Sequence, residues 1–143
     1  MVQPNFIDTA VGRLKVTTVG TGAPAVLWHS LFADERSWER VAARLAEDRR
    51  LVLITGPGHG DSGDPHHRYD LLQCARAAAQ VLDALGVAEP VDWVGNAWGG
   101  HVGIRFAAAY PRRINHWSPS ERRCRHWPPP SECALGFCCW STG

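Results

Sequence analysis

Val91 to Pro111 reads VDWVGNAWGGHVGIRFAAAYP, and this stretch decides the fold. It opens with a short apolar run typical of a buried strand, and a helix is expected from Val102 to Tyr110. The residues between them are rich in glycine, which permits positive φ and a close approach of helix to strand. The stretch therefore predicts a strand, a tight turn and a helix in direct succession. The turn residues around the central Ala97 and Trp98 are Gly95, Asn96, Gly99 and Gly100.

A strand, a G-x-(nucleophile)-x-G turn and a helix form a nucleophile elbow, whose central side chain stands on a strained turn at the carboxyl edge of a sheet. The central residue here is Ala97. A methyl group has no lone pair, so it cannot attack a carbonyl, an epoxide or a carbon–halogen bond. Strain at such an apex costs about 1 kcal/mol or more, and glycine would avoid it. We therefore interpret Ala97 as a replaced serine, natural or introduced. A βα turn with no catalytic history is the alternative.

The size and composition of the chain indicate one ordinary domain. It has 143 residues and a net charge of +1, which points to neither nucleic acid nor another strongly charged partner. The first ten residues lack the basic and apolar segments of a signal peptide, and no apolar run is long enough to span a bilayer. We therefore expect a cytoplasmic protein without membrane contact.

The chain before the turn predicts an α/β sheet. Phe6–Thr9 and Leu14–Val19 alternate around Gly12 and predict a hairpin. Continuous apolar runs at 25–28 and 51–54 are typical of strands covered on both faces. Helical patterns follow each run, the first capped by Asp34 or Ser37 and the second by Asp70 in a capping box with Gln73. The expected order is a β-hairpin and then βαβαβα, mostly parallel.

The composition changes after residue 113. Residues 114–143 contain four of the five cysteines, four of the ten prolines and a Pro128–Pro130 run that forbids a helix or a central strand. We therefore predict a domain over 1–113 and a disordered or frameshifted tail over 114–143. The strand at 91–94 would then lie at an open sheet edge, through which copies of the chain could associate.

Three motifs in order give residues 5–113 a family resemblance. The first is His29-Ser30-Leu31-Phe32, similar to an H-G-x-x loop, and the second is residues 56–63, similar to P-G-H-G-x-S. The third is the turn at residues 95–100. Together they resemble the amino-terminal half of the α/β-hydrolase fold, and the nearest groups are esterases, C–C hydrolases, prolyl aminopeptidases and dehalogenases.

This resemblance implies a set of site residues. Backbone N–H groups of Leu31 and Trp98 would form an oxyanion hole, and His29 would support the loop that carries Leu31. The implied substrates are esters or other small molecules, and no cofactor or metal is implied. The family places serine or aspartate at position 97, and its acid and catalytic histidine follow strands that come after the elbow. We therefore predict a truncated, catalytically inactive member.

Other interpretations remain open. A non-catalytic module for binding small molecules or proteins would use the same fold. Residues 58–63 also fit G-x-G-x-x-G with Asp83 twenty residues later, as in dinucleotide-binding enzymes. His59, Asp61 and Ser62 are interpreted as local turn chemistry. A zinc site is a further alternative, with candidate ligands at Cys124, His126, Cys133, Cys138 and Cys139.

Overall fold

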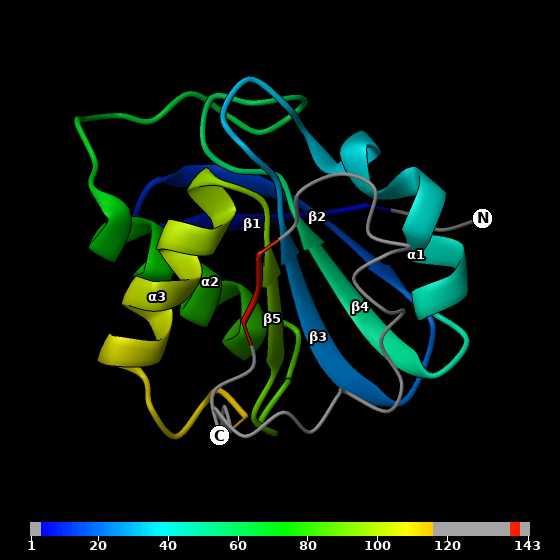
Figure 1. Cartoon of the computed structure of the whole chain (residues 1–143). Helices are drawn as coiled ribbons and strands as arrows, with labels where there is room; N and C mark the ends of the chain where they lie inside the picture. Colours follow the sequence, from blue (N-terminus) through cyan, green and yellow to red (C-terminus); the bar gives the residue numbers. More distant parts are fainter. Residues whose placement is uncertain (1–3, 116–137, 141–143) are drawn as a thin grey trace.

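The computed structural model describes residues 4–115 and, for the backbone alone, 138–140. These residues form one sheet with helices on both faces (Figure 1). The order of the strands across the sheet is β1-β2-β4-β3-β5-β6. The α/β class expected from the sequence is confirmed. The elements are β1 (Asn5–Thr9), β2 (Gly12–Val19), β3 (Ala23–Trp28), a 3₁₀ turn η1 (Glu35–Trp38), α1 (Glu39–Leu45), β4 (Arg49–Ile54), α2 (Leu71–Ala84), β5 (Asp92–Gly95), α3 (Trp98–Ala109) and β6 (Cys138–Trp140).

The predicted hairpin and parallel strands are present. β1 and β2 pair antiparallel across a turn in which Gly12 has φ 110°. β3 lies between β4 and β5 and runs parallel to both, so Trp28 is level with Ile54 on one side and Gly95 on the other. The carboxyl ends of these three strands therefore meet at one edge of the sheet, where the loops that follow them come together.

The two faces of the sheet are covered unequally. Helices α2 and α3 cover one face and α1 the other (Figure 1). The larger core includes Trp28, Trp93 and Phe106, and the small side chains of α2 let that helix lie close to the sheet. The capping box of α2 is present, with Asp70 accepting from the amide of Gln73. The smaller core is formed around Trp38 and Leu51.

Two details differ from the sequence expectations. Asp34 caps η1 instead of a long helix, and α1 begins only at Glu39.

The outer side of β5 is paired: Val91 bridges to Ile114 in parallel, and β6 pairs antiparallel with Trp93–Gly95. The prediction that β5 stands as an open edge is therefore wrong for these residues. Packing also continues beyond 113, because Ile114 is buried, whereas residues 116–137 and 141–143 lie outside the described part of the chain.

Candidate functional site

The turn after β5 has the backbone of a strained elbow. Ala97 has φ 46° and ψ −104°, and only one other non-glycine residue of the described chain, Phe32, has positive φ. A Cβ on Gly95 would lie 2.2 Å from the carbonyl carbon of Gly99, and a Cβ on Gly99 would lie 2.1 Å from the carbonyl oxygen of Trp28. The two glycines thus permit α3 to start directly against the strands. Ala97 is exposed at the apex, between Asn96 and the buried Trp98.

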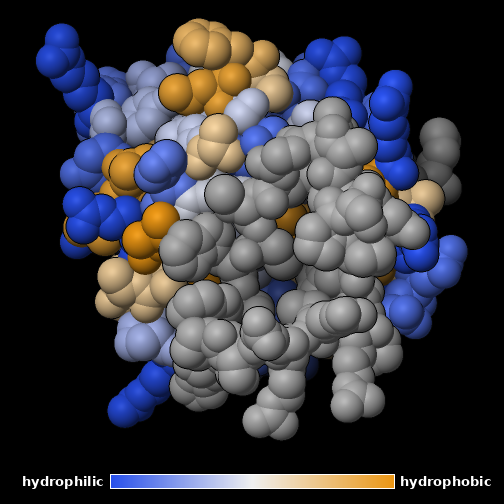
Figure 2. Space-filling model, in the orientation of Figure 1, coloured by the Kyte–Doolittle hydropathy of each residue, from blue (hydrophilic) through white to orange (hydrophobic). Residues whose placement is uncertain are grey.

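The resemblance implies two backbone amides as donors, one at the start of α3 and one in the loop after β3. Trp98 is the first residue of α3, so its N–H has no partner within the helix. Leu31 lies in the loop after β3, and its side chain is 48% exposed. Within residues 4–115, no hydrogen-bond acceptor is present for either amide. Figure 2 shows a group of apolar residues at the top of the face in view. The loop after β3, with the exposed Leu31 and Phe32, lies at the same end of the molecule in Figure 1.

His29 joins the loop after β3 to the loop after β4. Its ring is fully buried, with Nδ1 2.7 Å from the carbonyl oxygen of Ser30. Its Nε2 accepts from the amide of Gly56 at 2.8 Å. Burial lowers the pKa of His29, although the bond to Ser30 opposes that effect. Burial thus favours the neutral ring, which links the two loops.

His59 makes the opposite link, from the loop after β4 back to the loop after β3. Its Nδ1 lies 2.8 Å from the carbonyl oxygen of Pro57, and its Nε2 accepts from the amide of Phe32 at 3.3 Å. The ring also stacks on Trp98, with 5.2 Å between ring centroids. The interpretation of His59 as local turn chemistry is therefore incomplete, because its ring contacts Pro57 in its own turn but also reaches Phe32 and Trp98.

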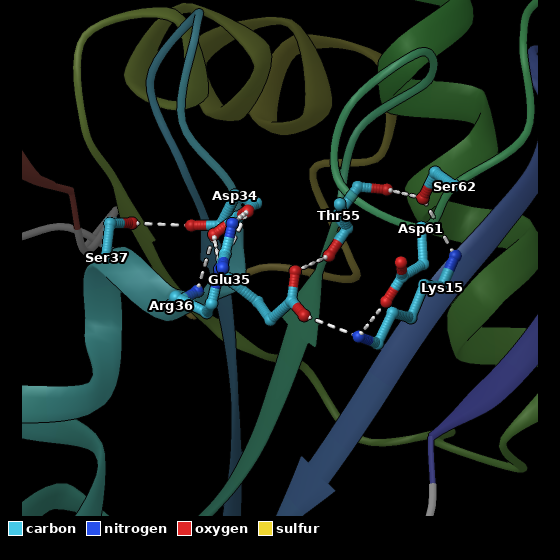
Figure 3. A network of polar contacts seen from close by, with 8 residues as sticks. All are labelled: Lys15, Asp34, Glu35, Arg36, Ser37, Thr55, Asp61 and Ser62. Atoms are coloured by element: carbon cyan, nitrogen blue, oxygen red, sulfur yellow. Dashed lines mark hydrogen bonds and ion pairs between the residues drawn. The ribbon is translucent and has the colours of Figure 1, made fainter.

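A polar network lies beside these loops (Figure 3). Lys15 Nζ contacts Glu35 Oε1 at 2.7 Å and Asp61 Oδ2 at 2.6 Å, and Thr55 Oγ1 donates to Glu35 Oε2 at 2.5 Å. The backbone amide of Lys15 donates to the hydroxyl of Ser62. The network ties η1, β2 and the loop after β4 to one another. The assignment of Asp61 and Ser62 to local turns is thus also incomplete.

The charges of this network are stabilised by one another. Hydrogen bonds from Lys15 to Asp61 and Glu35 raise the pKa of Lys15. Burial by itself would raise the pKa of Glu35, but the hydrogen bonds from Lys15 and Thr55 outweigh it and hold the pKa below its usual value. Asp34 has a lowered pKa because Arg36 donates to its carboxylate. The carboxylates of Asp34 and Glu35 are therefore ionised, and each already has a cationic partner.

Comparison with known proteins identifies the family to which the chain belongs. Residues 24–117 match the profile of the alpha/beta hydrolase fold family. The chain belongs to this family. A 2-hydroxy-6-oxononadienedioate/2-hydroxy-6-oxononatrienedioate hydrolase of Burkholderia vietnamiensis is 36% identical over 110 residues, which cover 71% of this chain and 37% of that protein. A 2-hydroxy-6-oxo-2,4-heptadienoate hydrolase of Pseudomonas putida is 29% identical over 114 residues, or 79% of this chain and 38% of that protein.

Solved structures of the α/β-hydrolase fold agree. An epoxide hydrolase superposes with a TM-score of 0.76 and 26% identity over 81% of this chain and 41% of its own. An esterase from Thermogutta terrifontis shares the fold, with a TM-score of 0.72 and 24% identity over 82% of this chain and 48% of its own. The chain spans between a quarter and two fifths of the length of the first curated relatives that it matches.

The structure does not favour a dinucleotide site in residues 58–63 of this hydrolase fold. The amide of Gly58 donates to the carbonyl of Gly63, and the amide of Gly63 donates to Arg13, so these donors are not directed at a ligand. The next helix, α2, begins only at Leu71, whereas a pyrophosphate site requires a helix that opens directly from the loop. The glycine pattern here builds a folded turn.

The remaining candidates are a metal site, a membrane-spanning helix and a surface depression. In the described ranges, no three His, Cys, Asp or Glu side chains cluster as metal ligands, and no helix there has the length and hydropathy to cross a bilayer. The side chains of the zinc alternative lie outside the described residues. A shallow depression of about 780 Å³ lies between η1 and the loop after β4, lined by residues that include Phe32, Asp34, Arg36 and His59.

Proposed function

We propose that this chain is a catalytically inactive member of the α/β-hydrolase family. It derives from a hydrolase of esters or other small molecules, and it forms no covalent intermediate at the elbow. The observation that carries the proposal is the exposed methyl group of Ala97 at the apex, with φ 46° and ψ −104°. The backbone geometry presents a side chain to a substrate, but the side chain has no nucleophilic atom.

Within residues 4–115, the histidine rings beside the elbow are engaged in hydrogen bonds and do not replace the missing base. His29 and His59 use both ring nitrogens in bonds between or within their loops. The Nδ1 of His101 is engaged with the carbonyl oxygen of Ala97. The donors of Leu31 and Trp98 stabilise a transition state by about 3 to 4 kcal/mol only when a tetrahedral oxyanion forms. Without an attacking atom, that stabilisation has no reaction to act on.

Activity-based labelling tests the proposal directly. We expect the purified full chain to show neither labelling by a serine-directed fluorophosphonate nor turnover of p-nitrophenyl acetate. Ala97→Ser supplies a hydroxyl but no base, so it is expected to remain unlabelled as well. Covalent labelling of the wild-type chain, located by peptide mass spectrometry, would overturn the proposal. Labelling of Ala97→Ser alone would show instead that a working base is present.

A binding module is the second candidate. It is favoured by the amides of Leu31 and Trp98, which have no acceptor among the described residues and so remain able to bind a carbonyl or carboxylate oxygen. A binding module must fold cooperatively by itself. Calorimetry and size exclusion of the full chain should then give one cooperative transition and a monodisperse peak. Aggregation would contradict this candidate, and a discrete dimer would support self-association.

A further inference from the structure

Two histidines hold the loops beside the elbow in a reciprocal arrangement. We name residues 29–34 the β3 loop and residues 55–63 the β4 loop. His29 of the β3 loop accepts from the amide of Gly56 in the β4 loop. His59 of the β4 loop accepts from the amide of Phe32 in the β3 loop. The ring centroids lie 5.1 Å apart, so the two links form one unit, which we name the histidine clamp.

The hydrogen bonds define the protonation of both rings. The Nδ1 atoms lie 2.7 Å and 2.8 Å from carbonyl oxygens, which can only accept, so each Nδ1 carries the hydrogen. Each Nε2 faces a backbone N–H, which can only donate, so each Nε2 presents its lone pair. This is the neutral ring in a single tautomer. Protonation of Nε2 would set one N–H against another and remove the link.

We infer that the histidine clamp is a proton-operated latch: the β3 loop is held while both rings are neutral, and protonation of His59 releases the segment around Phe32. The inference goes beyond the proposed function and does not depend on Ala97. Histidine is the side chain that ordinarily changes charge between about pH 5 and 8.

The two halves of the clamp are not equivalent. His29 is fully buried, and burial lowers its pKa, as does the nearby ring of His59 when that ring is charged. The ring of His59 is partly exposed and borders the open depression, so water can reach an imidazolium there. The Phe32 link is also the longer of the two, at 3.3 Å against 2.8 Å. Acidification should therefore break the Phe32 link and leave the Gly56 link in place.

Few other described contacts restrain the backbone at Phe32. Its φ of 63° is in the left-handed region, which costs a bulky residue about 1 kcal/mol or more. Its side chain is 98% exposed, so no packing resists movement. A turn bond from the amide of Ala33 to Ser30 at 3.3 Å remains. Loss of the His59 link would thus release strain as well as a restraint, and the neighbouring amide of Leu31 would lose its fixed direction.

The charged neighbours do not substitute for the lost link. A carboxylate facing His59 could bind the imidazolium and hold the ring in place. The carboxylates around the clamp are paired already: Asp34 with Arg36, and both Glu35 and Asp61 with Lys15. On the α3 side, the described ring contact of His59 is the uncharged Trp98. The charged and titratable groups around the clamp are His29 and Asp34 in the β3 loop, Glu35 and Arg36 in η1, Lys15 in β2 and Asp61 in the β4 loop, and the neighbouring Trp98 of α3 is uncharged.

Nuclear magnetic resonance of the full chain between pH 8 and pH 5 tests the latch. We expect the ¹⁵N shift of His59 Nε2 and the heteronuclear NOE of the Phe32 amide to change with one common midpoint. Well above the midpoint, the open fraction should rise about tenfold per pH unit lost, because one proton is taken up. The amide of Leu27 in β3 serves as an internal reference for global unfolding. The Gly56 amide should not change over the same range.

Variants separate the latch from a general effect of acid. His59→Gln offers an amide oxygen that does not titrate, so the Phe32 amide should become insensitive to pH. His66→Gln, at an exposed histidine outside the clamp, should leave the wild-type behaviour unchanged. The latch is refuted if the wild-type Phe32 amide is unchanged while His59 titrates, or if His59→Gln retains the transition. The wild-type measurement alone decides the question if His59→Gln does not fold.

Discussion

The elbow and the adjacent pair of loops both place backbone amides at the same sheet edge, but different forces hold them. The elbow depends on excluded volume: Gly95 and Gly99 are in place because no Cβ fits there. No side-chain cap stabilises the start of α3. The β3 and β4 loops depend on polar side chains instead, through the histidine clamp and the contacts of Glu35 and Lys15.

This difference explains how the turn can keep an elbow geometry with alanine at residue 97. Steric constraints at residues 95 and 99 act on the backbone and are indifferent to the side chain at 97. The loops are different, because a single proton or a lost charge changes their contacts. Apart from the contact of His101 with the carbonyl oxygen of Ala97, the elbow should therefore respond to added atoms, whereas the loops should respond to both charge and pH.

The largest expected effect is steric. In Gly99→Ala the new Cβ would lie 2.1 Å from the backbone oxygen of Trp28, and backbone atoms cannot move aside cheaply. We expect a loss of about 3 kcal/mol or more in the free energy of unfolding, measured by urea titration with tryptophan fluorescence. Gly86→Ala is the matched control, since it has φ 66° but nothing within 4 Å, and should cost about 1 kcal/mol. Equal losses in the two variants would contradict the steric account.

The next effect is electrostatic. Glu35→Gln keeps the shape of the side chain but removes its charge beside Lys15, where both side chains are 15% exposed. Because Lys15 keeps Asp61, the loss in unfolding free energy should be moderate, about 1 to 2 kcal/mol after solvent screening. Asp61→Asn, at a side chain that is 70% exposed, should cost less than about 1 kcal/mol. The reverse order in urea titrations would show that Asp61 is the main partner.

Features that depend on neighbouring residues could be predicted from the sequence, whereas contacts between distant residues could not. The glycines around Ala97, the hairpin at Gly12 and the capping box of Asp70 act within a few residues, so sequence spacing reveals them. The clamp joins Phe32 to His59 across 27 residues, and the Lys15–Asp61 contact spans 46. A histidine or aspartate in a glycine-rich turn has a sufficient local explanation, so nothing in the turn itself points to the distant partner.

The residues of β6, which pairs with β5, also carry no sequence signal for a strand. Apolar runs rich in valine, isoleucine and leucine marked β3 and β4, but residues 138–140 read Cys-Cys-Trp and contain none of these. Their pairing with Trp93–Gly95 depends on backbone hydrogen bonds at the sheet edge. Composition therefore could not identify this strand.

A smaller effect concerns pH. Burial lowers the pKa of His29, so the unfolded chain takes up a proton near the ordinary value of about 6.5 and the folded chain only at lower pH. Stability is thus complete above about pH 6.5 and falls as the pH drops from there to the folded pKa, by at most about 1.4 kcal/mol per pH unit. Urea titrations of His59→Gln between pH 8 and 5 measure how the unfolding free energy depends on pH when His59 cannot titrate. Adding His29→Gln should remove the pH dependence that His29 causes. An unchanged pH dependence in the double variant would exclude His29 as its source.

The smallest effect has the opposite sign. Ala97 is exposed and has φ 46°, so replacing it with glycine removes backbone strain without removing packing. Glycine also gains freedom in the unfolded chain, so the net gain in unfolding free energy should be no more than about 1 kcal/mol. Ala43→Gly, at an exposed position within α1, should lose about 1 kcal/mol in the same urea titration. If Ala97→Gly is also destabilised, the methyl group makes contacts that hold the apex, and steric constraint by Gly95 and Gly99 alone is not enough to maintain the elbow.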